Sequence, residues 1–160
     1  MDIEDRLRAI ETRLRAAEDQ LEIIRLLNSY GPLVDSGSGL EASELWLDDG
    51  RYDVGGGPRF TPGELVEMYG DEGHMALVNT GSSHLTATPR ITVDGDTATA
   101  VAYSFVVLRE GERWFLFRAS INHWTLSRTE QGWRIRERFN RVLDGSPDSH
   151  EVMRRVLEPS

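Results

Sequence analysis

Long segments in which apolar and polar residues alternate, each ended by a short turn, constrain the fold of this chain most. Four segments have this pattern: 84–93, 97–109, 113–128 and 133–143. The turns between them are DGD, EGE and TEQG. Side chains alternate between two faces along a β-strand, and turns rich in Gly and Asp join antiparallel neighbours. The second half of the chain therefore predicts a meander of four long antiparallel strands.

The N-terminal segment has a different periodicity. Apolar residues recur there at spacings of four and three: Ile3, Leu7, Ile10, Leu14, Ala17, Leu21 and Ile24. This is the a/d pattern of a coiled coil over three heptads. Two interpretations remain open: the helix lies on its own domain, or its first half protrudes and packs on a partner subunit. Pro32 is expected to end or kink the helix near Gly31.

Shorter elements connect this helix to the strands. Thr61-Pro-Gly-Glu64 has the form of a capping box with proline at the first helical position. The expected elements are a loop at 36–39, a helix at 40–50, a strand at 51–54, a turn at 55–58, a helix at 64–70 and a capped C-terminal helix at 146–157, while 71–83 is ambiguous. Helices followed by a meander predict an α+β fold, with helices on one face of a curved antiparallel sheet. Such a cone encloses a pocket, and the expected parts are a heptad extension (1–17), the domain (18–145) and a C-terminal helix (146–160).

Composition excludes several classes of protein. The chain has 160 residues, 39% hydrophobic and 28% charged, which is typical of one globular domain. No apolar run approaches the roughly 20 residues of a membrane span, and the N-terminus lacks the apolar core of a signal peptide. A net charge of −9 disfavours nucleic acid, and the absence of cysteine is compatible with the cytoplasm, the location we expect. We therefore expect neither a membrane nor a nucleic acid as partner.

Few residues carry an obvious chemical signal. The four histidines lack metal-site spacing, so we expect no metal and no cofactor. No serine-hydrolase, P-loop or dinucleotide motif is present. Isolated polar residues stand in apolar surroundings instead: His84 and Asn122 in strands, Arg138 in the last strand, and Asp35 after the first helix. Each alone is more commonly a structural residue, and strand parity places Asn122 on the face opposite His123.

Taken together, the segments resemble a known family. EIIRLLNSYGPLVDSG, ASELWLDDGRYDVGG, SSHLTATPRITVDGDTATA and ASINHWTLSRTEQGWRIRERFNRVLDG are similar, in this order, to the SnoaL-like branch of the nuclear-transport-factor-2-like (NTF2-like) superfamily. The resemblance covers about residues 18–145, and it is nearest to members of the scytalone dehydratase and bile acid 7α-dehydratase type. It implies the helix-lined cone inferred above.

The resemblance also implies roles for individual residues. Asp35 and His84 match the family's Asp–His dyad, and Tyr30, five residues before Asp35, matches a catalytic tyrosine. Arg138, five residues after a tryptophan, matches an arginine that lines the cavity, and Asn122 matches a substrate-binding asparagine. The second catalytic histidine of scytalone dehydratase has no counterpart in 97–109, which puts that particular reaction in doubt. The pocket's shape would come from residues such as Trp46, Tyr69, Met75, Phe105 and Phe117, with Trp46 expected to contact substrate.

These residues favour a cofactor-free lyase of the dehydratase type, or an isomerase or cyclase, acting on a small hydrophobic polyketide-, steroid- or terpene-like molecule. His84 would be the general base, and Asp35 would orient it. A non-catalytic small-molecule-binding or protein-assembly module of the same fold is the alternative. An epoxide hydrolase is a third, although the strands lack a second aspartate for its Asp–Arg–Asp arrangement. We expect a homo-oligomer, either a dimer or a trimer.

Overall fold

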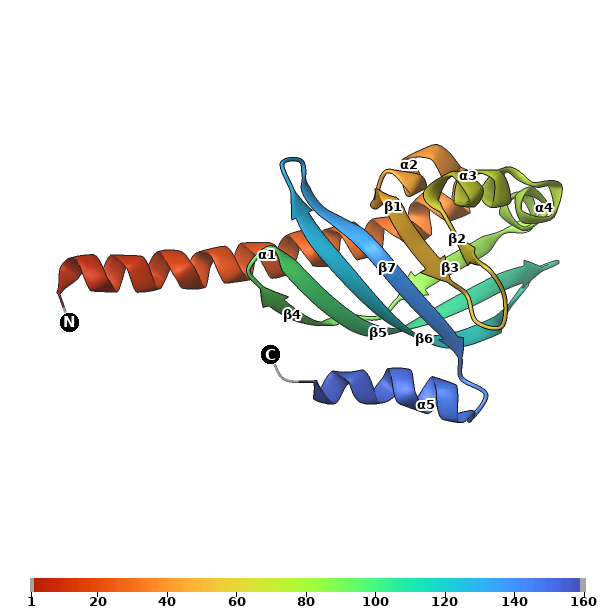
Figure 1. Cartoon of the computed structure of the whole chain (residues 1–160). Coiled ribbons are helices and arrows are strands. Elements are labelled where there is room, and N and C mark those ends of the chain that lie inside the picture. The colour runs from red at the N-terminus through yellow and green to blue at the C-terminus, as the bar shows by residue number, and fades with distance from the viewer. Residues whose placement is uncertain (1, 159–160) are drawn as a thin grey trace.

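A curved sheet of seven strands is the centre of the computed structural model, which describes residues 2–158 (Figure 1). Its order is β2-β1-β7-β6-β5-β3, and β4 also pairs with β5. All pairings are antiparallel except that of β1 with β7. The strands are β1 (Trp46–Asp53), β2 (Arg59–Phe60), β3 (Ser82–Thr86), β4 (Arg90–Asp94), β5 (Thr97–Glu110), β6 (Arg113–Thr129) and β7 (Gly132–Val142). The expected α+β architecture is confirmed.

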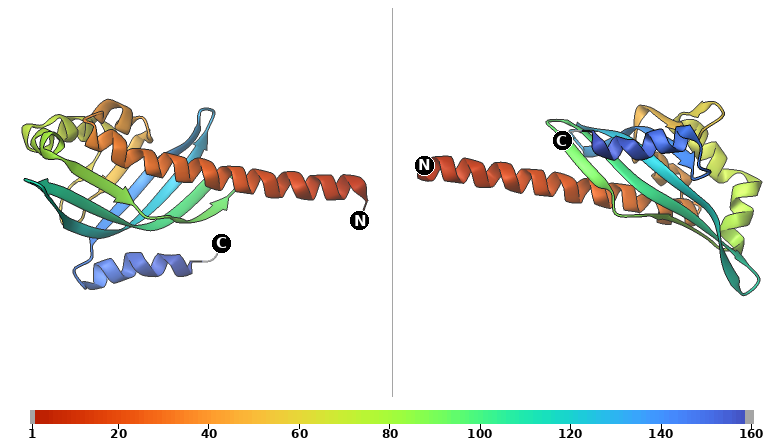
Figure 2. Two further views of the ribbon diagram at one scale, coloured as in Figure 1. Left: turned by 180° about the vertical axis from the view of Figure 1, so that it is seen from behind. Right: turned by 90° about the horizontal axis from the view of Figure 1, so that it is seen from below.

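Most helices lie together on one face of this sheet, and the C-terminal helix lies on the other (Figures 1 and 2). The helices are α1 (Ile3–Asp35), α2 (Gly39–Ser43), α3 (Pro62–Gly70), α4 (Glu72–Thr80) and α5 (Pro147–Arg154), followed by a 3-10 turn (Arg155–Leu157). The second half of α1 packs with the sheet, burying Ile23, Leu27 and Val34. The first half of α1 extends beyond the sheet.

The local sequence signals of helix and turn are confirmed. Thr61 accepts a hydrogen bond from the Glu64 amide, and the Glu64 carboxylate accepts one from the Thr61 amide, which completes the capping box of α3. Gly95 and Gly111 occupy the β4–β5 and β5–β6 turns at φ of 59° and 61°. Glycine tolerates this left-handed region, so the turns can be tight.

Two expected elements differ in the structure. The predicted helix 40–50 is wrong: only Gly39–Ser43 is helical, and strand β1 begins at Trp46. Pairing with β7 allows β1 to bury Trp46 and Tyr52, which outweighs local helix propensity. The single strand expected at 84–93 is divided into β3 and β4 around Pro89, whose missing N–H cannot join a sheet ladder. The ambiguous segment 71–83 forms α4 and the start of β3.

Helix α1 also continues past Pro32, where we expected it to end or kink. Proline at this position removes the amide that would bond to the carbonyl of Asn28. Asn28 is exposed, so that carbonyl can bond to water instead. The helix continues for almost one more turn, and the Ser36 amide closes it by donating to the Pro32 carbonyl at 3.0 Å. This extra turn brings Asp35 to the sheet.

Candidate active site

Asp35 and His84 form a hydrogen-bonded pair where the end of α1 meets the middle of β3. The Nδ1 atom of His84 lies 2.6 Å from the Asp35 Oδ1 atom. The backbone amide of His84 donates to Asp35 Oδ2 at 2.6 Å, and the Ser82 hydroxyl donates to Oδ1 at 2.7 Å. Three donors from one strand therefore fix the carboxylate at the helix end.

Gly31 allows the helix to approach the strand this closely. A Cβ atom at Gly31 would lie 2.0 Å from the carbonyl oxygen of His84, far inside van der Waals contact. Gly31 is also one turn before Asp35, on the same side of α1. A glycine in the last turn of the helix is thus what lets the carboxylate reach both the ring and the backbone of His84.

The partners of Asp35 define the protonation of the pair. Burial raises the pKa of Asp35, but the hydrogen bonds from the His84 ring, the His84 amide and Ser82 outweigh this, and the pKa is lowered. An ionised carboxylate only accepts hydrogen bonds, so the Nδ1 atom of His84 carries a proton in this contact. The other ring nitrogen, Nε2, makes no hydrogen bond within residues 2–158. The contact therefore leaves one ring nitrogen of His84 free to bind another molecule.

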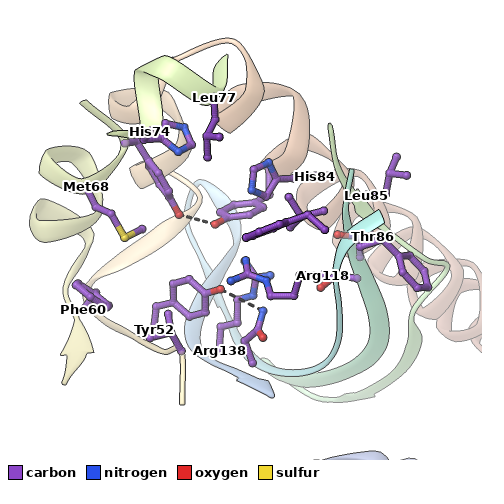
Figure 3. A pocket seen from close by; sticks show the side chains of 18 residues that line it. Tyr52, Phe60, Met68, His74, Leu77, His84, Leu85, Thr86, Arg118 and Arg138 are labelled. Atoms are coloured by element: carbon purple, nitrogen blue, oxygen red, sulfur yellow. Dashed lines mark hydrogen bonds between the residues drawn. The ribbon is translucent and has the colours of Figure 1, made fainter. Parts of the chain in front are cut away.

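His84 lines a cavity of about 350 Å³ between the helices and the sheet (Figure 3). Six apolar residues, each from a different helix or strand, form much of its wall: Phe60, Met68, Leu77, Leu85, Phe105 and Phe117. In Figure 3, His74 and His84 lie toward the helices, and Tyr52 and Arg138 lie toward the sheet. A mostly apolar cavity with a few convergent polar groups is the usual form of a small-molecule site.

Two tyrosines meet inside this cavity. The hydroxyl of Tyr30, on α1, is hydrogen-bonded to that of Tyr69, on α3, and their rings pack edge to face at 6.2 Å. Burial raises the pKa of Tyr30, and burial together with the neighbouring phenols Tyr30 and Tyr52 raises that of Tyr69 well above its usual range. Both phenols therefore stay protonated. Since one proton satisfies the contact between them, the other remains available as a donor.

Arg138 places a buried positive charge below these phenols. Its Nε–H donates to Asn122 Oδ1 at 2.8 Å, and the Asn122 amide in turn donates to the Ser104 hydroxyl at 2.7 Å. The guanidinium lies 4.6 Å from the ring centres of both Tyr30 and Tyr52. Arg138 is only 4% exposed, and no carboxylate pairs with it in the described part of the chain. Arginine keeps its charge when buried, so this group can bind an anionic oxygen.

A β-bulge explains why Arg138 faces inward. Leu126 pairs with Ile135, but Thr125 pairs with Glu137, so Arg136 is an extra residue in β7. Trp133 and Ile135 point to the core before this bulge, and Arg138 and Asn140 do so after it. In a regular strand Trp133 and Arg138, five residues apart, would point to opposite faces. The bulge reverses the parity and brings Arg138 into the cavity.

The structure brings together most of the residues that the sequence singled out. Tyr30, His84 and Arg138 line the cavity, Asp35 is bonded to His84, and Asn122 supports Arg138 from below. Of the residues expected to shape the pocket, Tyr69, Phe105 and Phe117 line it. Trp46 and Met75 are not among the described residues that do. Trp46 lies in the core against Tyr52, at 5.9 Å between ring centres.

The sequence analysis did not single out the other polar residues of the cavity. Tyr52 accepts a hydrogen bond from the Asn140 amide at 3.2 Å, and both line the cavity. His74 comes from the ambiguous segment 71–83; its Nε2–H donates to the Val34 carbonyl at 3.1 Å, and its ring lies 6.3 Å from that of His84. The Asp71 cap before it was a visible sign of a helix there. The cavity therefore holds a second histidine, on a helix instead of a strand.

Neither a metal cluster nor a membrane span is found in residues 2–158. No group of three or more His, Cys, Asp or Glu side chains there is arranged to hold a metal ion. No helix in the same range combines the length and the apolarity that crossing a bilayer requires.

Helices on one face of a curved, unclosed sheet, around a pocket with polar groups at its base, define the NTF2-like class of proteins. Within this class, the chain belongs to the SnoaL-like domain family, whose model matches residues 15–139. The family includes polyketide cyclases and dehydratases. The resemblance inferred from the sequence is thus confirmed.

Solved structures agree with this assignment. An NTF2-like protein with a cystatin-like fold from Novosphingobium aromaticivorans is 38% identical, over 92% of this chain and 96% of that one, with a TM-score of 0.88. A function-unknown protein of Mycobacterium tuberculosis is 21% identical over 92% and 90% of the two chains, with a TM-score of 0.71. A further N. aromaticivorans protein, assigned provisionally as an aromatic ring hydroxylase, is 21% identical over 79% and 90%, with a TM-score of 0.61. No curated protein matches the chain significantly.

Proposed function

We propose that this protein is a cofactor-free lyase of the dehydratase type, or an isomerase or cyclase using the same groups, for a small hydrophobic polyketide-, steroid- or terpene-like substrate. The observation that carries this proposal is the 2.6 Å contact between Asp35 and the ring of His84 at the wall of the cavity. A carboxylate bound to one ring nitrogen fixes the tautomer and makes the other nitrogen more basic. His84 is the base, and Asp35 orients it.

In the elimination, Nε2 of His84 removes a proton from carbon next to a substrate carbonyl. The C–H electrons form the new double bond, and the bond to the β-hydroxyl breaks. That hydroxyl takes a proton from the Tyr30–Tyr69 pair and leaves as water, and the proton held on His84 then returns to the phenols through solvent. In the isomerase variant, His84 returns the proton to a different carbon of the same substrate.

Arg138 supports these steps electrostatically. Removing a proton next to a carbonyl builds negative charge on the carbonyl oxygen, and a buried guanidinium without a carboxylate partner stabilises such charge. Arg118, exposed at the edge of the same cavity, can bind a polar or anionic group of the substrate. The apolar wall residues would bind the hydrocarbon part.

The test is a panel of β-hydroxy ketones with polyketide-like and steroid-like skeletons, followed by the absorbance of the conjugated ketone that forms when water is lost. His84→Ala is expected to lower turnover by about 10²–10⁴-fold, the usual contribution of a general base. His150→Ala, at an exposed position on α5, is the matched control and should leave turnover unchanged. Equal turnover by His84→Ala and the unchanged protein would contradict the proposal.

A non-catalytic binding module is the second candidate, and one observation favours it. Two of the three donors to Asp35 are the His84 amide and the Ser82 hydroxyl, which fasten β3 to α1 and need no chemistry. Deuterium exchange distinguishes the two functions. A binder would bind the ketones without exchanging their α-protons for solvent deuterium, whereas an enzyme of either proposed type would catalyse the exchange, and His84→Ala would not.

A further inference from the structure

The first half of α1 is a helix without a partner in the described chain. Residues 3–18 are all exposed, and this part of α1 projects beyond the sheet (Figures 1 and 2). Ile3, Leu7, Ile10 and Leu14 are 73%, 53%, 57% and 55% exposed. A surface helix normally buries its apolar stripe. A regular row of exposed Leu and Ile therefore indicates a surface that another chain covers.

The apolar row lies on the opposite side of α1 from the domain. Ile23 and Asp19, which face the domain, are 0% and 6% exposed, whereas Leu21 between them is 51% exposed. Asp19 and Ile23 occupy heptad positions f and c, and Leu21 occupies position a. Since f and c lie across the helix from a and d, the domain leaves the whole row uncovered from Ile3 to Leu21.

The charges beside the row differ on its two sides. Position g, before each a residue, holds Arg6 and Arg13, and position e, after each d residue, holds Glu4, Glu11 and Glu18. In a parallel coiled coil, g of one helix meets e of the next heptad on its neighbour. Arg6 would then meet Glu11 of a second copy, and Arg13 would meet Glu18. In an antiparallel arrangement g meets g and e meets e, which would bring like charges together.

The apolar residues themselves indicate how many helices associate. Position a is Leu at 7, 14 and 21, and position d is Ile at 3, 10 and 24 with Ala at 17. Leu at a with Ile at d shifts parallel coiled coils from dimers to trimers and tetramers. We propose that the row formed by Ile3, Leu7, Ile10, Leu14, Ala17 and Leu21 binds further copies of this chain, as a parallel, in-register bundle of three or four α1 helices. The folded domains lie around the outside of this bundle.

Disulfide crosslinking tests the orientation, and the chain is suited to it because it contains no cysteine. Leu7→Cys, made in the full chain, places one thiol in the row. In a parallel, in-register bundle these thiols come within the roughly 7 Å between Cα atoms that a disulfide requires. Mild oxidation is expected to give covalent dimers, while Thr12→Cys, on the outer side of the helix, should give few. No difference between these two variants, or no crosslinking by either, would overturn the proposal.

Charge reversal tests the pairing and the copy number, with mass in solution as the measurement. Arg6→Glu with Arg13→Glu makes both sides of the row acidic, and Glu11→Arg with Glu18→Arg makes both basic. Each double variant is expected to raise, by about tenfold or more, the protein concentration at which half of the oligomer dissociates. Mixing the two variants should restore association, as hetero-oligomers.

Arg8→Glu with Arg15→Glu is the control, because it makes the same charge change at exposed positions away from the row. Its mass should equal that of the unchanged protein, at three or four copies. If this control weakened association between copies as much as the double variant of Arg6 and Arg13 does, the charge pairing would be refuted. An unchanged mass in the double variant of Arg6 and Arg13 would also refute it. A mass of two copies for the unchanged protein would refute the bundle.

Discussion

At the scale of single residues, Gly31 decides whether the dyad can form. It belongs to α1 and contacts the His84 carbonyl, so it sets the distance between the helix that carries Asp35 and the strand that carries His84. No other residue type leaves room for that carbonyl without moving β3. The contact thus links the packing of the domain to the position of its proposed base.

We expect Gly31→Ala to lower both stability and turnover. The new methyl group would force β3 away from α1 and lengthen the hydrogen bonds of Asp35 to the His84 ring and amide. Overpacking of this kind costs about 1–3 kcal/mol in the free energy of unfolding. Chemical denaturation and the ketone assay would measure the two effects. Gly70→Ala is the control, because it adds a methyl group to another helix where nothing lies within 4 Å; a similar loss in both variants would contradict the explanation.

Single residues also mark what the sequence could and could not predict of the site. Asp35, His84 and Tyr30 lie together as the family resemblance implied. The family resemblance also implied that Arg138 lines the cavity, but strand alternation alone did not, because its inward direction depends on the bulge at Arg136. Tyr69 and His74 come from short helices whose facing depends on how they pack, so sequence reasoning left their direction open.

At the scale of elements, an ion pair joins the middle of α1 to the β6–β7 hairpin. Asp19 accepts from two nitrogens of Arg128 at 2.6 and 2.8 Å, and from the Trp133 indole at 3.2 Å. Arg128 also lies 4.5 Å from the centre of the Trp133 ring. These contacts lie where α1 leaves the domain, so they anchor the base of the projecting helix.

Asp19→Asn is expected to lower the free energy of unfolding by about 1–3 kcal/mol, because it leaves a charged, partly buried Arg128 without its best acceptor. Thermal or urea denaturation would measure this. Asp5→Asn removes an exposed ion pair with Arg8 in the same helix and should change stability by about 1 kcal/mol or less. If Asp19→Asn lowered the free energy of unfolding no more than Asp5→Asn does, the contacts of Asp19 would contribute nothing measurable to stability.

Helix α5 covers the outer face of the sheet and encloses His123. The Nδ1 atom of His123 accepts a hydrogen bond from Arg155 at 3.0 Å, and its Nε2 atom has no partner in the described chain. Burial, and secondarily the charge of Arg155, lowers the pKa of His123 to about 4, although Glu158 opposes this. His123 is therefore neutral in the folded protein at neutral pH.

This lowered pKa predicts a loss of stability in mild acid. Between about pH 6.5 and pH 4 the unfolded chain binds a proton at His123 and the folded chain does not, so the free energy of unfolding falls as the pH falls. The loss is about 3 kcal/mol at most. His123→Phe should flatten the dependence in this window, measured by denaturation at each pH, and His150→Ala should not. The lowered pKa values of Asp19, Asp35 and Asp53 make these carboxyls lose their stabilising effect below about pH 5, so they overlap only the acid end of this window.

Among the elements, the long strands and the capped helices were predictable, and the short elements without such a signal were not. The strands β5, β6 and β7 extend over many residues, so their alternation is repeated often enough to be unambiguous. The segment 40–50 is short, and its second half is a strand only because β7 is available to pair with it. Tertiary pairing of this kind has no local signature.

At the scale of the whole molecule, α1 divides into a half that belongs to the domain and a half that does not. Removing residues 1–17 is therefore expected to lower the oligomeric state while leaving the cavity and its turnover unchanged, because Asp19 and everything after it remain. Sedimentation equilibrium and the ketone assay would check both parts. An unchanged mass would mean that the copies associate through other surfaces, and a loss of turnover would mean that the cavity depends on the assembly.

The cavity takes its dyad from one pair of elements and its walls from others. Asp35 and His84 belong to α1 and β3, whereas Phe60, Met68 and Leu77 belong to β2, α3 and α4. Side chains of these wall elements can thus change in size without disturbing the contact between the helix end and the strand. If the proposed function holds, a protein built this way can acquire new substrates by small steps, each altering the outline of the chamber while the proposed proton-transfer groups stay where they are. A directed-evolution library confined to those three positions would exploit the same freedom.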